Sequence, residues 1–325
     1  MLFSIVLVSL AILPFSHAYS INWPFSTGQM AVCLNLTIGT PPQQIPAFID
    51  SNSDYNSLEV LTTKKHGLFN PNESHTFVKT GIAYDDDNNR IGIYGKDVMN
   101  INGVKLKSKS FIVNDYKTMY QQLHYGVLGL ARSNTDTPSF IESVLNGLDE
   151  RFIVFSFDEI NLHDLSVNGL LTLGGYPTAR CSQSFLSFPE EPYYNGQQWG
   201  MKIDELQIGK YVYDQPGVAI IAFNSPEISV PASYYSTVKK VFNVGYGNVV
   251  SCDLDIEIVF TIGGMDFKIR ADDYLQKDKD SDTCTLLISQ TGTDTGFILP
   301  LTILRDQCWI LDYDQLTIGF TDRVL

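Results

Sequence analysis

The sequence contains two copies of one short strand and turn, and this internal repeat constrains the fold more than any other feature. Residues 45–53 read IPAFIDSNS, and residues 217–229 read GVAIIAFNSPEIS. Each copy has Ala, two bulky apolar residues, a variable pair and then Asn-Ser, but Asp50 of the first copy is matched by Ala222 in the second. The repeat predicts two similar halves, one with an acid where the other has a methyl group.

The repeat continues beyond these turns. The compact apolar run VLGLA occupies residues 127–131, and FILPL occupies residues 297–301. Gly129 follows Asp50 by 79 positions, and Pro300 follows Ala222 by 78. Matching internal spacing indicates two β lobes built by duplication, with equivalent turns facing each other across a cleft, which is the usual place for a ligand.

The pattern of apolar runs predicts an all-β protein. Short β-branched and aromatic runs, such as RFIVFSF and WGMKIDELQIG, alternate with Gly, Asn, Asp and Pro. Helical periodicity is confined to residues 137–148 and 232–243. At 325 residues the chain is long for a single core. We therefore expect an N-terminal lobe over residues 19–188 and a C-terminal lobe over residues 189–325.

The first 18 residues are typical of a secretory signal peptide, with an apolar stretch over residues 2–15 and the small-residue site Ser16-His17-Ala18. No later apolar run has the ~18 residues that a membrane span needs. We expect a secreted or lumenal protein in which disulfides are permitted. Glycosylation sequons begin at Asn35, inside a strand-like run where use of the site is an open question, and at Asn72, in a polar turn.

Charge and residue spacing exclude several kinds of site. The formal net charge of −14 argues against nucleic acid and anionic membranes as partners, because both need a basic patch. Asp54 and the acidic run at residues 85–87 lack the spacing of a Ca²⁺ loop and are interpreted as solvated turns. The five histidines lie far apart. We expect no metal and no cofactor.

Several motifs resemble the pepsin-like aspartic proteases, in the order in which that family has them. LTIGTPPQQIPAFIDSNS is similar to its opening strand and first catalytic loop, and YGVLGLARS to its apolar-apolar-Gly segment. NGLLTLGGYP resembles the strand before the crossover between lobes, and QQWGMKIDELQIG the start of the second lobe. The match covers residues 30–325 and implies an all-β, bilobal fold with a cleft between two duplicated lobes.

The resemblance places the family's two catalytic carboxyls at Asp50 and at position 222, which is Ala. Two carboxyls about 3 Å apart share one proton, so that one acts as base toward a water while the other stays protonated. The methyl group of Ala222 can neither hold this proton nor polarise a carbonyl. Asp50 alone is expected to titrate like an ordinary carboxyl.

Other positions of the implied site also depart from the family. The two Gly positions that follow the acids are Asn52 and Asn224, whose side chains would project where substrate and water sit. The bracing hydroxyl is kept as Ser51 but becomes Phe223 in the second copy, where we expect the ring to fill apolar space. The resemblance implies a cleft lined by Ser51, Asn52, Ser53, Tyr84 of the covering hairpin at residues 79–96, Phe223, Asn224 and Ser225. Neither Ser53 nor Ser225 has a histidine near it in sequence to act as a base.

Five cysteines follow the signal peptide, so at least one has no partner within the chain. The resemblance pairs Cys252 with Cys284. Cys33, Cys181 and Cys308 have no partners in the family. Cys181 and Cys308 fall on strands that should meet in the sheet joining the lobes, and a bridge between them remains open.

The sequence thus favours a secreted, monomeric, non-catalytic pepsin-like protein whose cleft binds a peptide, a protein or another ligand. Active family members carry a prosegment of a few dozen residues, and the stretch from Ala18 to Asp50 has room only for the first strand of the mature protein. The alternative function is that of an aspartic endopeptidase with an altered, single-acid mechanism. A peptide-digestion assay between about pH 3 and 6 would separate the two.

Overall fold

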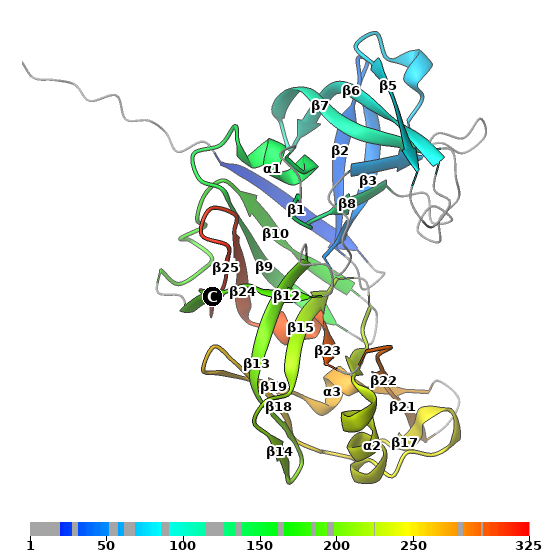
Figure 1. Ribbon diagram of the computed structural model, residues 1–325, viewed down its shortest axis with the longest axis vertical. Helices are drawn as coiled ribbons and strands as arrows, with labels where there is room; N and C mark the ends of the chain where they lie inside the picture. The colour runs from blue at the N-terminus through cyan, green and yellow to red at the C-terminus, as the bar shows by residue number, and fades with distance from the viewer. Residues whose placement is uncertain are drawn as a thin grey trace, which may run out of the picture.

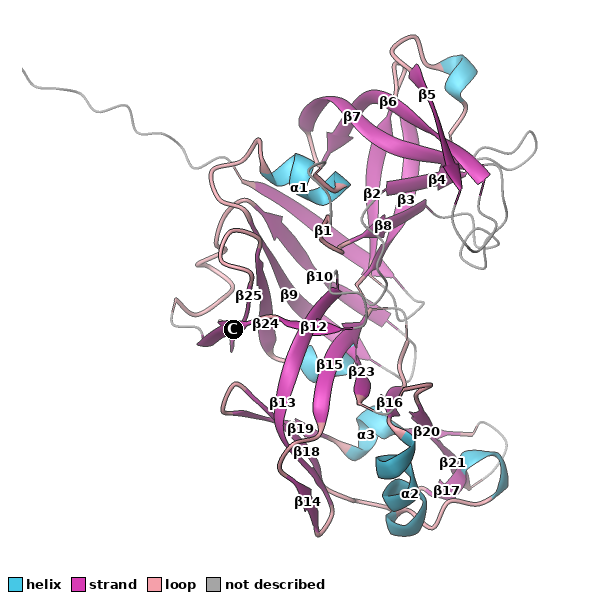
Figure 2. Cartoon of the chain, in the orientation of Figure 1, coloured by secondary structure: helices cyan, strands magenta, loops and turns pink. Residues whose placement is uncertain are grey.

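The computed structural model shows an elongated molecule with one lobe at each end and a sheet between them (Figure 1). It describes residues 20–27, 32–51, 58–61, 69–85, 91–114, 126–133, 138–161, 166–183, 186–193, 198–223, 225–278, 282–293 and 295–324. Strands dominate both lobes, as Figure 2 shows, so the predicted all-β, bilobal fold is confirmed. No helix in the described part of the chain is long and apolar enough to cross a membrane.

The N-terminal lobe is built on a seven-stranded sheet with the order β2-β3-β8-β4-β7-β6-β5. Its strands are β2 (Cys33–Ile38), β3 (Gln43–Asp50), β4 (Leu58–Leu61), β5 (Val78–Asp85), β6 (Ile91–Ile101), β7 (Val104–Asn114) and β8 (Gly126–Gly129). Strand β8 is buried along its whole length, as expected of a strand in a parallel pair with both faces covered. Between β6 and β7 lies Asn102-Gly103, where φ is 45° and 89°, the backbone of a tight hairpin turn.

The C-terminal lobe repeats this design in a nine-stranded sheet and adds a small three-stranded sheet. The larger sheet consists of β12 (Glu191–Tyr193), β13 (Gln198–Ile208), β14 (Tyr211–Tyr213), β15 (Gly217–Ala222), β16 (Ile228–Val230), β18 (Ile258–Ile262), β19 (Met265–Ile269), β22 (Ile288–Gln290) and β23 (Gly296–Pro300). The smaller sheet consists of β17 (Val249–Ser251), β20 (Leu275–Lys277) and β21 (Thr283–Leu286).

A six-stranded sheet joins the lobes and takes strands from both halves of the chain, with the order β1-β10-β9-β24-β25-β11. The strands are β1 (Ile21–Thr27), β9 (Phe152–Asn161), β10 (Ser166–Leu173), β11 (Leu186–Pro189), β24 (Gln307–Asp312) and β25 (Thr317–Asp322). Because β24 from the end of the chain pairs with β9 from its first half, the C-terminal strands close the molecule at its centre.

Both helices expected from periodicity are present, in shorter form. They are α1 (Phe140–Leu145), within the predicted residues 137–148, and α2 (Ala232–Val241), within residues 232–243. Helix α1 begins at a capping box in which Ser139 and Glu142 bond each other's backbone N–H groups. The run DFKIRADDYL, residues 266–275, is not strand throughout. It divides into β19 and the short helix α3 (Ala271–Tyr274), where Asp273 accepts from the N–H of Arg270.

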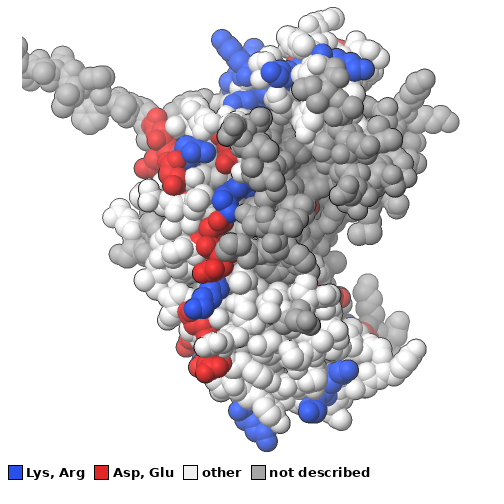
Figure 3. All heavy atoms as spheres, in the orientation of Figure 1, with Lys and Arg blue, Asp and Glu red and all other residues white. Residues whose placement is uncertain are grey.

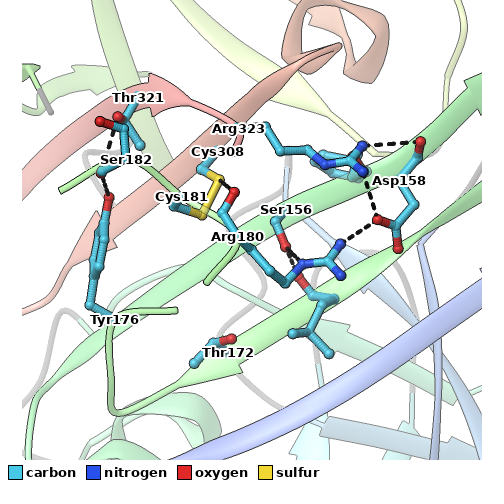
Figure 4. Close-up of a disulfide and its surroundings, with 12 residues drawn as sticks. Ser156, Asp158, Thr172, Tyr176, Arg180, Cys181, Ser182, Cys308, Thr321 and Arg323 are labelled. Atoms are coloured by element: carbon cyan, nitrogen blue, oxygen red, sulfur yellow. Dashed lines mark hydrogen bonds and ion pairs between the residues drawn. A yellow bond between two sulfur atoms is a disulfide. The ribbon is translucent and has the colours of Figure 1, made fainter. Parts of the chain in front are cut away.

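Two disulfides connect distant parts of the chain. Cys252 is bonded to Cys284 within the C-terminal lobe, so the pairing implied by the resemblance is confirmed. Cys181 is bonded to Cys308, which settles the open pairing and attaches the crossover segment to β24 (Figure 4). Cys33 is a free cysteine. Burial raises the pKa of its thiol to about 11.

An arginine clamp, formed by Arg180 and Arg323 on Asp158, flanks the Cys181–Cys308 bond. The Arg180 guanidinium lies 2.6 Å from the Asp158 carboxylate and the Arg323 guanidinium 3.1 Å from the same oxygen (Figure 4). Arg323 also donates to the carbonyl oxygen of Phe157. The disulfide and the clamp together hold the end of the chain against β9.

Candidate active site

The Asp50 turn stands at the end of a pair of parallel strands. Strand β3 ends at Asp50 and runs beside β8, with Asp50 opposite Gly129 and Ile49 opposite Leu128. The strands carry a nearly continuous apolar run because neighbouring elements cover both faces. Asp50 is the first acidic residue after this apolar run, and it is only 6% exposed.

The second half of the chain repeats this pair residue for residue. Strand β15 ends at Ala222 and runs parallel to β23, with Ala222 opposite Pro300 and Ile221 opposite Leu299. The matching spacings of 79 and 78 positions therefore correspond to equivalent strand pairs, and the predicted duplication is confirmed. Ala222 occupies in its lobe the place that Asp50 occupies in the other.

One hydroxyl group joins the two turns across the boundary between the lobes. Ser51 Oγ donates to the carbonyl oxygen of Ile221 at 2.7 Å and accepts from the N–H of Phe223 at 3.1 Å. Both bonds are buried, and they satisfy backbone groups on either side of Ala222. The backbone on both sides of position 222 is thereby held against the turn that carries Asp50.

Phe223 does not return an equivalent bond, because its side chain belongs to the core. The residue is fully buried, and its ring centroid lies 4.8 Å from Phe155, 5.3 Å from Trp309 and 5.9 Å from Phe157. These three aromatic residues come from β9 and β24 of the central sheet. The ring thus fills apolar space, as expected, but packs into the sheet rather than lining the cleft as the sequence suggested.

The remaining predicted site residues are described only in part. Asn52, Ser53 and Asn224 lie outside the described residues. The backbone of Tyr84 pairs with Gly92 in the hairpin of β5 and β6, and its side chain lies outside the described part. Ser225 is described: its Oγ accepts from the N–H of Glu227 at 3.2 Å and stabilises its own turn.

A brace behind the Asp50 turn was not predicted from the sequence. Leu130 donates its N–H to the carbonyl oxygen of Asp50 at 3.0 Å. The carbonyl oxygen of Leu130 accepts from Trp199 Nε1 at 3.0 Å and from the Tyr313 hydroxyl at 2.9 Å. Burial raises the pKa of Tyr313, which keeps the phenol protonated as a donor. Two aromatic residues of the second half therefore position the Asp50 turn through Leu130.

An ion pair adjoins this brace. The guanidinium of Arg132 bonds the carboxylate of Glu190 and lies 5.6 Å from the ring centroid of Trp199. Burial raises the pKa of Glu190, while the charge and hydrogen bond of Arg132 oppose that rise. The only sequence feature that could have identified the region was Trp199 itself, at the start of β13.

In the part of the chain that the structure describes, no group of three or more His, Cys, Asp or Glu side chains is placed to hold a metal ion. A hollow of about 620 Å³ lies along β12–β15 in the C-terminal lobe. Its lining consists of Glu191, Lys202, Ile203, Asp204, Asp214, Gln215, Gly217 and Val218, none of which is a predicted site residue.

Comparisons with known proteins agree with this arrangement. A family model described as eukaryotic aspartyl protease matches residues 33–323. The chain is 28% identical over 272 residues to cathepsin E of Aquarana catesbeiana, covering 75% of this chain and 66% of the relative. It is 24% identical over 331 residues to aspartic protease 1 of Caenorhabditis elegans, covering 89% and 81%. It is 25% identical over 273 residues to rhizopuspepsin-4 of Rhizopus niveus, covering 77% and 67%. The chain thus spans about two thirds of the length of the first and third relatives.

Proposed function

This chain belongs to the eukaryotic aspartyl protease family, and we propose that it is a member that keeps the fold without catalysing peptide hydrolysis. In this proposal it is a secreted, monomeric protein that binds a peptide, a protein or another ligand between its lobes. The relatives named cathepsin, protease and pepsin support the family and the fold, and the argument against catalysis comes from this chain's own residues.

The observation that supports the proposal is the place of Ala222. It lies opposite Pro300 as Asp50 lies opposite Gly129, and Ser51 bonds the backbone on both of its sides. The scaffold that would present a second carboxyl is therefore assembled, and the carboxyl is missing. Hydrolysis by a shared-proton pair needs one group that is ionised and one that is protonated, and a methyl group can be neither.

The role of Phe223 supports the same reading. In the family, the hydroxyl at this position would brace the first turn as Ser51 braces the second. Here the position is occupied by a core ring that contacts Phe155 and Trp309. The change removes one of two reciprocal bonds that hold catalytic groups in register, and displacements of about 1 Å can cost ~10²-fold in rate.

Independent features support secretion and glycosylation. Two disulfides are typical of an oxidising compartment, and the N-terminal residues resemble a signal peptide. Asn35 and Asn72, which begin the two sequons, are both exposed. We propose that the protein enters the secretory route and that Asn72, within the short 3-10 turn Pro71–Glu73, carries a glycan.

The test is a digestion assay with purified mature protein, an unbiased peptide library and pH values between about 3 and 6. We expect no cleavage above the level of a matched Asp50→Asn variant, because the loss of one member of a catalytic unit typically costs 10⁴-fold or more. Cleavage by the wild type that disappears in Asp50→Asn would overturn the proposal and establish the single-acid endopeptidase instead. Cleavage present in both proteins would identify a contaminant.

A binding measurement completes the test. The same peptide library, immobilised, is expected to retain the wild type through a subset of sequences, since both halves of the cleft scaffold are in place. A variant with Asp50→Arg would place a long cation at that scaffold and should lose this retention. Retention that is identical in the two proteins would show that the peptides bind elsewhere and would refute cleft binding.

A further inference from the structure

The outer face of the β6–β7 hairpin carries a row of lysines in a chain that is otherwise strongly acidic. Between residues 91 and 114 the sequence has four lysines and one acid, whereas the whole chain has a formal net charge of −14. Three of these lysines, Lys96, Lys105 and Lys107, are exposed. We call these three residues the lysine row.

Strand register places the lysine row on one face of the sheet. Along β6 the odd residues 95–101 are buried, so Lys96 and Asn100 point to the opposite, outer face. Lys105 pairs directly with Asn100 and shares its face, and Lys107 follows two positions later along β7. A bulge between Asp97 and Met99 separates this pair from Lys96, which lies opposite Ser110.

The one acid of the hairpin does not neutralise the row, because it faces inward. Asp97 is 1% exposed and accepts hydrogen bonds from Ser74 Oγ at 2.7 Å, Thr76 Oγ1 at 2.6 Å and the N–H of Val98 at 2.7 Å. Within the described residues no ion pair engages the lysine row. Lys109 belongs to the other face and donates to the carbonyl oxygen of Ser143.

The row has the dimensions and neighbours of a site for an extended anionic chain. Lys96 lies opposite Ser110, and Lys105 lies opposite Asn100, which follows Lys96 by four residues along β6. At ~3.3 Å per residue, the row therefore extends about 13 Å along the strand. Polar groups of Thr37, Asn100 and Ser110 share the face and could bond hydroxyl or sulfate oxygens. Figure 3 shows blue side chains gathered at the top of the view, over this lobe, whereas red and blue side chains are mixed lower down.

The chemistry of the face favours one class of polyanion. Its described residues include no exposed aromatic ring, and Tyr94, two positions before Lys96 along β6, is half-buried, so the face offers only a poor platform on which nucleic acid bases could stack. Val78 is its one exposed large apolar residue, too little to enter a bilayer. Short lysine-rich segments such as KLKSK, residues 105–109, are typical of patches that bind heparin or nucleic acid.

We propose that the lysine row binds a sulfated polysaccharide chain through its ammonium groups. The net negative charge of the molecule does not prevent this, because charges beyond the Debye length of about 8 Å at physiological ionic strength are largely screened. The site is on the outer face of the N-terminal lobe and does not depend on whether the cleft is catalytic.

The test measures retention of the full mature protein on immobilised heparin, and the affinity for heparin in solution over a range of salt concentrations. The test variant is Lys96→Gln with Lys105→Gln and Lys107→Gln. The matched control is Lys210→Gln with Lys239→Gln and Lys240→Gln, which changes the net charge equally on the C-terminal lobe. All six positions are exposed, so both variants should keep the wild-type melting temperature.

We expect the wild type and the control to bind heparin alike and the test variant to bind at least 10-fold more weakly. The slope of log affinity against log salt should fall by about two, since each contact with a single-stranded polyanion contributes about 0.7. Equal binding by wild type and test variant, or equal binding to desulfated heparin, would overturn the proposal. Stronger binding to single-stranded DNA or to phosphatidylserine vesicles would overturn it in favour of those partners.

Discussion

At the level of single residues, Ala222 and Phe223 make separate contributions. Ala222 removes a chemical group and leaves the backbone unchanged, since its strand keeps the same parallel pairing as the strand of Asp50. Phe223 removes a hydroxyl and adds a ring to the core of the central sheet. The first substitution concerns the reaction alone, whereas the second concerns both the bracing of the Asp50 turn and the stability of the core.

We predict that Ala222→Asp alone yields at most weak peptide hydrolysis, well below the 1–10 s⁻¹ of typical enzymes. The new carboxyl would face the Asp50 turn, but Phe223 cannot supply the reciprocal brace. The measurement is a single-turnover digestion at pH 3–6, with Ala222→Asn as the matched control. Rates of ordinary enzymes from the single variant would show that one side chain was all that the site lacked.

We predict that Phe223→Ala lowers the free energy of unfolding by about 3–5 kcal/mol, because it empties a fully buried space among Phe155, Phe157 and Trp309. Urea denaturation followed by tryptophan fluorescence would measure the change. Phe223→Leu keeps most of the volume and should cost less. A loss below about 1 kcal/mol for the Ala variant would contradict the placement of the ring. Restoring a hydroxyl here would therefore weaken the fold.

At the level of elements, the molecule is held together by pairings between strands far apart in sequence. Strand β24 pairs with β9, and the Cys181–Cys308 bond lies beside this pairing with the arginine clamp on Asp158. The Cys252–Cys284 bond instead connects β21 to the segment just after β17, within one lobe. The Cys181–Cys308 bond therefore links two distant parts of the chain, whereas the Cys252–Cys284 bond links residues within one lobe.

We predict that the two disulfides stabilise the fold unequally. Loop closure predicts about 5 kcal/mol for Cys181–Cys308, with a separation of 127, and about 4 kcal/mol for Cys252–Cys284, with a separation of 32. Paired Cys→Ala variants, compared by urea denaturation, would test this order. A larger loss on removing Cys252–Cys284 would show that strain or residual structure outweighs loop length.

At the level of the whole molecule, side-chain hydrogen bonds around the Asp50 turn join the two halves, in addition to the central sheet that takes strands from both. Ser51 joins its turn to the backbone of Ile221 and Phe223, and Leu130 is held by Trp199 and Tyr313. Beside them, Arg132 bonds Glu190, a carboxylate with a raised pKa. These contacts hold the Asp50 turn from both sides of the lobe boundary.

We predict that Glu190 makes the protein more stable in acid. Its pKa in the folded state is raised above 4.5, so its contribution is fully present below about pH 4.5 and is lost as the pH rises through the folded value. Melting temperatures of Glu190→Gln should change less between pH 4 and 7 than those of the wild type. Glu73→Gln, on an exposed turn, is the control. A melting temperature that depends more steeply on pH in Glu190→Gln than in the wild type would contradict the prediction.

Some features of this protein could be predicted from local pattern and repetition in its sequence. They are the all-β class, the duplicated strand pairs, and the match of Ala222 to Asp50. Each depends on the spacing or alternation of residues along the chain, which can be recognised without knowing the contacts in the folded protein. Which distant residues meet is known only from the folded chain: Phe223 contacts Trp309, Cys181 bonds Cys308, and Leu130 accepts from Tyr313. Such contacts depend on the register of strands at least 78 positions apart in sequence, and no short stretch of sequence carries that information.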